Sequence, residues 1–71
     1  MKWIARDAYH FEREDGRWSI IPCVADKFAL CCLKDSRPIV SGLASKAAAA
    51  REAMRQDKAD GYVPPPVAGD A

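Results

Sequence analysis

Residues 18–33, which read WSIIPCVADKFALCCL, constrain the fold of this chain more than any other stretch. Twelve of these sixteen residues are apolar even without Pro22. Side chains alternate between the two faces of a strand, so two strands drawn from this stretch would be apolar on both faces. The one long helical segment, Ser45–Lys58, offers mostly alanine and can cover only one of those faces. We therefore expect the second face to meet something else.

The strands are predicted from period-2 alternation and from turn residues between the alternating runs. Asp15-Gly16 separates the first two runs and favours a hairpin with a type I′ turn, because glycine accepts a positive φ freely. Pro22 marks a strand end, since proline donates no ladder hydrogen bond. Residues 1–5 are ambiguous, because Trp3 and Ile4 could either extend the sheet or cap its core. The expected strands are Tyr9–Arg13, Arg17–Cys23, Phe28–Leu33 and a short Ile39–Ser41.

The helix has recognisable ends. Ser45 is a good N-cap, its hydroxyl accepting from an amide of the first turn, and Gly61 is a natural terminator. Ala47, Ala50 and Met54 form a narrow apolar stripe in the expected helix. The fold class is therefore α+β: a three- to four-stranded antiparallel β-meander with one C-terminal helix packed on one face. We expect a single domain over 1–61 and a Pro-rich flexible tail over 62–71.

Size and charge make some classes of protein less favoured than others. Seventy-one residues allow one small domain, and the formal net charge of +1 lacks the basic excess usual in nucleic-acid binders. The odd cysteine count (Cys23, Cys31 and Cys32) does not suggest a disulfide framework, and burial as small apolar side chains is the preferred interpretation. No stretch reaches the roughly 18 apolar residues of a membrane span, and the N-terminus lacks the apolar core of a signal peptide. We expect a cytoplasmic protein.

No motif in the chain names a reaction. His10 is the one imidazole available as a general base, and it lies beside Glu12 on an expected strand. Carboxylates gather at the first hairpin, where an exposed tip would not shift their pKa values as a catalytic pair requires. The pairs of closely spaced ligands typical of zinc sites are absent, and the four glycines are isolated rather than grouped in a phosphate loop. We expect no enzyme, no metal and no cofactor.

The layout of three strands followed by a helix resembles integrase arm-type DNA-binding domains. Gly16-Arg17-Trp18 in the second strand and the helix that follows Ser45 carry this resemblance over residues 9–58. It implies that the uncovered sheet face enters a major groove. That face would offer Arg17 and Lys27 to the DNA, but also Ile21, Cys31 and Leu33, and base readout prefers Arg, Lys, Asn or Gln. DNA binding is therefore the alternative prediction.

A protein-binding surface fits the apolar second face better, because exposed apolar patches usually mark interaction sites. In size and make-up the chain is similar to phage-encoded anti-CRISPR inhibitors, and this resemblance implies a non-enzymatic protein that occludes a larger host complex. The partner is expected to be another protein or a second copy of the chain, unless the termini of the chain fold back over the face. The predicted contact residues are Arg17, Ser19, Ile21, Ala29, Cys31 and Leu33, with the hairpin acids Glu12, Glu14 and Asp15 as a second contact.

Overall fold

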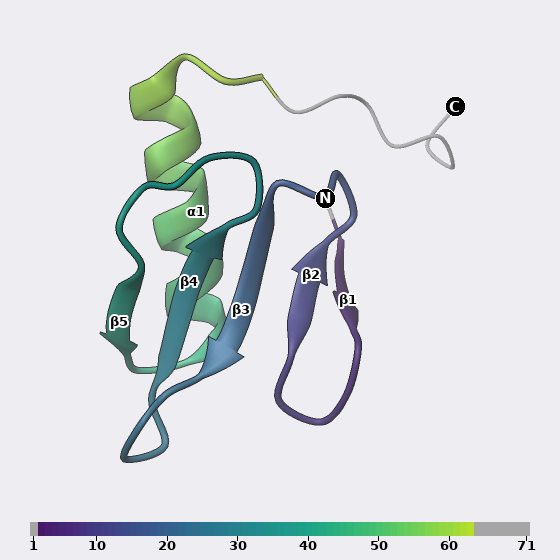
Figure 1. Cartoon of the computed structure of the whole chain (residues 1–71), viewed down its shortest axis with the longest axis vertical. Coiled ribbons are helices and arrows are strands. Elements are labelled where there is room, and N and C mark those ends of the chain that lie inside the picture. Colours follow the sequence, from purple (N-terminus) through teal and green to yellow (C-terminus); the bar gives the residue numbers. More distant parts are fainter. Residues whose placement is uncertain (1, 64–71) are drawn as a thin grey trace.

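The chain forms one antiparallel sheet with a helix on one side, as expected for the α+β class, and the structure is a computed structural model that describes residues 2–63 (Figure 1). The sheet contains five strands in the order β1-β2-β3-β4-β5, each paired antiparallel with its chain neighbour. The prediction of three to four strands was therefore too low. The elements are β1 (Trp3–Ala5), β2 (Phe11–Arg13), β3 (Trp18–Pro22), β4 (Phe28–Cys32), β5 (Val40–Leu43) and α1 (Lys46–Asp60).

The additional strand is β1, which pairs with β2 so that Ile4 lies opposite Glu12. Of the two roles considered for the N-terminal residues, extension of the sheet is the one observed. The side chain of Trp3 also packs against the core. This anchoring holds β1 in place although it is only three residues long.

The hairpin between β2 and β3 does not use the predicted type I′ turn. The amide of Gly16 donates to the carbonyl of Arg13 at 2.8 Å, and Gly16 has a φ of 74° whereas Asp15 keeps a negative φ. A type I′ turn requires positive φ at both central residues. The consecutive positive values occur instead at Ala25 (57°) and Asp26 (59°), in the turn between β3 and β4.

The two caps of α1 were predicted correctly, but its buried face was not. Ser45 accepts from the amide of Ala48 at 3.1 Å, and Gly61 ends the helix in the left-handed conformation. The buried residues are Ala49, Ala53 and Asp57, spaced four apart on one face. The predicted stripe of Ala47, Ala50 and Met54 was wrong, since Met54 is 67% exposed. The observed row brings a carboxylate to the sheet, a contact that apolar periodicity does not reveal.

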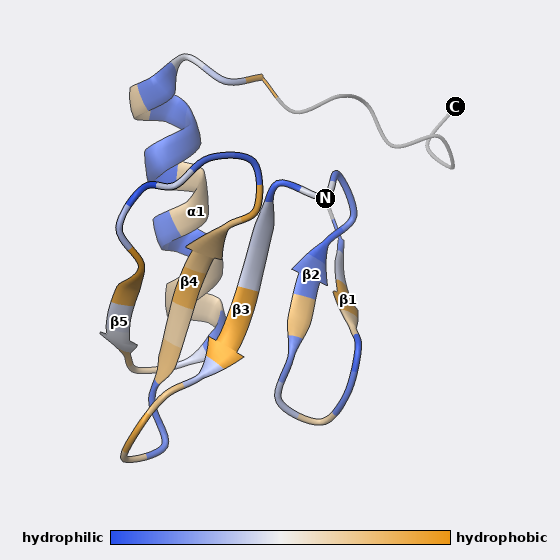
Figure 2. Cartoon of the chain, in the orientation of Figure 1, coloured by the Kyte–Doolittle hydropathy of each residue, from blue (hydrophilic) through white to orange (hydrophobic). Residues whose placement is uncertain are grey.

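The core lies between α1 and the sheet face that the sequence indicated. Trp18 and Ile20 from β3 and Leu30 from β4 are almost completely buried, and the small side chains of Ala49 and Ala53 let the helix approach closely. Apolar residues are concentrated on β3 and β4 in Figure 2. Trp3, Phe11, Phe28, Val40 and Leu43 pack around this centre from β1, β2, β4 and β5. On this side of the sheet, α1 therefore covers β3, β4 and β5.

Candidate protein-docking face

The sheet face opposite α1, called the open face below, carries most of the predicted contact residues. Ser19 lies opposite Cys31 and Ile21 opposite Ala29 in the β3–β4 pair. The core residues of these strands alternate with them and point to α1, so these four side chains point away from the helix. In Figure 1 the helix lies behind the sheet, and the viewer looks onto the open face.

The open face has an apolar half and a charged half. Over β3 and β4 its centre is made of small or medium side chains, of which Ser19, Ile21 and Cys31 are half-buried. Ala29 is only 4% exposed, so its prediction as a contact residue was wrong, whereas Leu33, just after β4, is 47% exposed. Over β1 and β2 it carries Ile4, which is 41% exposed, and an exposed ion pair in which Arg6 donates to Glu12 at 3.4 Å. A low, mostly apolar surface thus continues into a charged border.

Within the described residues neither terminus folds back over this face, and Ile4 lies on it as part of β1. Trp3 and Leu43 pack into the core on the helix side of the sheet. The hydroxyl of Tyr62 donates to Asp15 at 3.0 Å, near the C-terminal end of α1. Tyr62 therefore belongs to the folded part of the chain rather than to the predicted tail, most of which lies outside the described residues. Within residues 2–63, no helix or strand packs on the open face.

The prediction that Arg17 is a contact residue of the open face is wrong. Its Nε donates to Asp57 at 2.8 Å and its Nη2 to Asp60 at 2.7 Å. The guanidinium lies 4.1 Å from the ring centre of Tyr62, and the side chain is only 11% exposed. Arg17 precedes β3 at the end of the hairpin, where regular alternation does not apply, and the helix carboxylates hold it on the helix side. It is therefore unable to contribute its charge to the open face.

The prediction that Asp15 is an exposed contact residue in the turn is also wrong. Arg13 donates two hydrogen bonds, of 2.8 and 2.7 Å, to the carboxylate of Asp15, and the Asp15 side chain is only 2% exposed. Burial alone would raise the pKa of Asp15, but the bonds from Arg13, the Arg17 amide and Tyr62 outweigh it and lower the pKa to about 2. Glu12 remains on the open face, whereas Glu14 accepts from the backbone amide of Lys2 at 2.9 Å. The three acids thus do not act as one patch.

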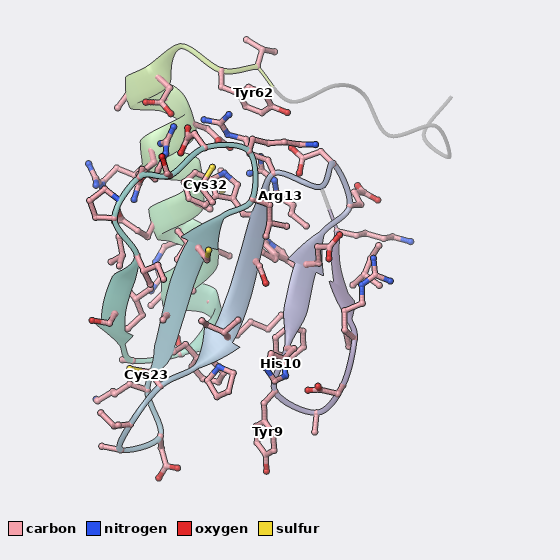
Figure 3. All side chains as sticks on the ribbon, viewed as in Figure 1. Tyr9, His10, Arg13, Cys23, Cys32 and Tyr62 are labelled. Carbon is pink, nitrogen blue, oxygen red and sulfur yellow. The ribbon has the colours of Figure 1, made fainter. Side chains whose placement is uncertain are left out.

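These residues belong to a buried ionic network that joins the sheet to the end of the helix. Asp57 is its centre: it accepts from Arg13 at 2.6 Å and from the indole N–H of Trp18 at 2.9 Å, besides Arg17. Burial by itself would lower the pKa of Arg13, but its bonds to Asp15 and Asp57 reverse this and raise the pKa. Figure 3 shows Arg13 and Tyr62 at the same end of the molecule. The network orients α1 and leaves the open face free of these charges.

The remaining reactive groups do not assemble into a site. The three cysteines are free: Cys31 is half-buried on the open face, whereas Cys32 is buried in the core. His10 pairs with Asp7 at 2.7 Å in the loop between β1 and β2. In residues 2–63 no three potential metal ligands come together. In the same range no helix has both the length and the apolar character needed to cross a bilayer.

Comparison with known proteins adds no further constraint on function. No protein-family model, curated protein or solved structure matches the chain. The open face is therefore the feature of the molecule that points to a function.

Proposed function

We propose that the chain is a non-enzymatic protein-binding module that docks a partner protein through the open face. The observation that carries the proposal is an uncovered sheet face whose centre is apolar over β3 and β4 and whose border is charged over β1 and β2. Protein interfaces combine a desolvated core with a polar rim in this way. The core cluster does not include Ile4 or Leu33, which are the most exposed apolar residues of this face and are free to contact a partner.

The apolar area that a contact buries sets its strength. Burial of roughly 400 Å² of apolar surface contributes about 10 kcal/mol at about 25 cal/mol per Å². Association costs of about 4–15 kcal/mol oppose this gain. The open face alone therefore supports a modest affinity, and a tight complex needs additional contacts at its charged border.

The mode of action that we assign to the module is steric occlusion of a surface on a larger assembly. The small size, the absence of a catalytic signature in the sequence and the similarity in make-up to anti-CRISPR-type inhibitors support this mode. A phage origin and a host defence complex as the target stay predictions from the sequence. The DNA-binding alternative is weakened, because Arg17, one of the two cations it relied on, is bound to Asp57 and Asp60.

A pair of matched variants tests the proposal. Leu33→Asp places a charge on the open face, whereas Met54→Asp places one on the outer surface of α1, where the methionine is also exposed (67%, against 47% for Leu33). Affinity capture from a host lysate should give partner proteins that wild type and Met54→Asp retain and Leu33→Asp loses. Circular dichroism checks that both variants fold. Retention of every captured partner by Leu33→Asp would contradict docking through this face.

A salt titration distinguishes the DNA-binding alternative from the proposed protein binding. DNA binding should weaken steeply with salt and should weaken further on Lys27→Glu. Lys27 is exposed beside the turn between β3 and β4, so this substitution does not disturb the core. Binding to duplex DNA that depends on Lys27 and survives Leu33→Asp would favour the DNA-binding function over the protein-binding one.

A further inference from the structure

The two edges of the sheet differ in their capacity to accept another strand. β1 and β5 are the edge strands. The pairing of β5 with β4 is interrupted by a register shift, and Gly42 within β5 has a φ of 73°. Such bulges obstruct further pairing at an edge. β1 keeps an unbroken register with β2 from Trp3 to Ala5, so β1 is the edge that remains regular.

The backbone of β1 directs unused hydrogen-bonding groups outward. The amide of Glu14 donates to the carbonyl of Lys2 at 3.0 Å, and the amide of Arg6 donates to the carbonyl of His10 at 2.8 Å. Residues of an antiparallel strand point alternately toward and away from the partner strand, so the N–H and C=O groups of Trp3 and Ala5 point away from β2. In the described part of the chain, no turn or loop bonds these four groups.

The side chains along this edge specify the charge of an incoming strand. Lys2, Ile4 and Arg6 alternate onto the open face, and all three are exposed. A neighbouring strand would place its own side chains beside them. Opposite charges across neighbouring strands stabilise a pair and like charges destabilise it. The edge therefore fits a strand with the pattern acidic–x–apolar–x–acidic.

We propose that β1 binds an extended acidic–apolar segment of a partner protein as a sixth strand. The inference rests on the proposed function in that the partner is a protein, but it uses the backbone of β1 rather than the apolar half of the open face. Strand addition of this kind takes its affinity from main-chain bonds and its specificity from alternate side chains. Trp3 packs in the core and holds the edge in position for such pairing.

A second copy of the chain is a poor occupant of the same edge. Two antiparallel β1 strands that overlap over all three residues would place Ile4 beside the Ile4 of the other copy. Lys2 of each copy would then lie opposite Arg6 of the other, and the cations would repel each other. The charges at the two ends of β1 thus select against self-pairing and in favour of an acidic partner.

The test is a titration of the full-length, isotope-labelled protein with two palindromic heptapeptides, TETVTET and TKTVTKT, followed by amide NMR. The peptides share their β-forming residues and differ only in charge. We expect TETVTET at millimolar concentration to shift the amides of Trp3 and Ala5 and to slow their hydrogen exchange. We expect TKTVTKT to bind about 3- to 10-fold more weakly at low salt, from two cross-strand charge pairs.

Variants locate the effect. The double variant Lys2→Gln/Arg6→Gln should bind both peptides equally, whereas the control Lys27→Gln/Lys34→Gln, with two exposed cations elsewhere, should keep the preference. Leu33→Asp should leave peptide binding intact, which distinguishes failure of this inference from failure of docking through the open face. Equal binding of both peptides by wild type, absence of shifts at Trp3 and Ala5, or protection of these amides before peptide is added would each overturn the proposal.

Discussion

Replacement of Asp57 by alanine should remove most of the stability of this protein. The carboxylate accepts from Arg13 at 2.6 Å, from Arg17 at 2.8 Å and from Trp18 at 2.9 Å. Its loss would leave the almost fully buried Arg13 guanidinium without half of its counter-charge and the buried indole N–H without an acceptor. Removal of one partner from a buried ion pair costs about 3–5 kcal/mol.

That cost is large for a chain of this size. At about 0.05–0.15 kcal/mol per residue, the 71 residues support a total stability of about 4–11 kcal/mol. The measurement is urea unfolding followed by tryptophan fluorescence, since Trp18 is buried against α1. With a slope near 1 kcal/mol per molar urea, the midpoint should fall by about 3 M or the folded baseline should disappear.

Asp60→Ala is the matched control, three residues further along the same helix. The Asp60 side chain is 35% exposed, and its partners Arg17 and Arg37 each keep another carboxylate, Asp57 and Asp35. Loss of such an exposed pair costs about 1 kcal/mol or less. Equal destabilisation by Asp57→Ala and Asp60→Ala would refute the argument that burial makes Asp57 the centre of the network.

Three further predictions concern single residues. Ala25→Gly should stabilise the fold by about 0.5–1 kcal/mol and raise the melting temperature by several degrees, because Ala25 has a φ of 57°; a lower melting temperature would contradict this. Ser45→Ala should cost about 1 kcal/mol in urea unfolding through loss of the bond to the Ala48 amide, and an unchanged midpoint would refute the cap. The pKa of Asp15 is lowered from 3.8 to about 2, so its contribution of about 2 kcal/mol is present above pH 4 and lost as the pH falls toward 2. Asp15→Asn should therefore flatten the stability profile between pH 4 and 2, and a profile like that of wild type would count against this assignment.

The sequence predicted those parts of the fold that depend on local patterns. Ser45 and Gly61 were recognised as caps because capping chemistry acts within one helical turn. Trp18, Ile20 and Leu30 were recognised as core because alternation places them on one face. β1 was left ambiguous, since three residues are too few to show a period of two. Capping and strand alternation are thus recognisable in the sequence only where enough neighbouring residues take part in the pattern.

The errors about the site have a different physical origin. Arg17 was placed on the open face by alternation, and Asp15 was read as an exposed turn residue. Arg17 is held instead by Asp57, 40 residues away in the sequence. Asp15 is bound by its near neighbour Arg13, which is itself held by Asp57, 44 residues away. Ion pairs of that separation leave no local periodicity. One signal was available: Asp57 continues the alanine row of residues 49 and 53 at intervals of four, which puts a carboxylate on the buried side of the helix.

The position of Asp57 and Asp60 in a helix that follows all five strands also orders the folding of this protein during synthesis. The five strands pair only with their chain neighbours, so the sheet can form progressively as it leaves the ribosome. Arg13 precedes Asp57 by 44 residues, and at about 5–20 residues per second the carboxylate follows roughly 2–9 s later. During that interval Arg13 and Arg17 lack the helix carboxylates, and the apolar helix-facing side of the sheet lacks its cover. Until α1 emerges, a nascent chain of this protein therefore exposes apolar side chains on both faces of its sheet. A chaperone that shields apolar strands can act in that interval.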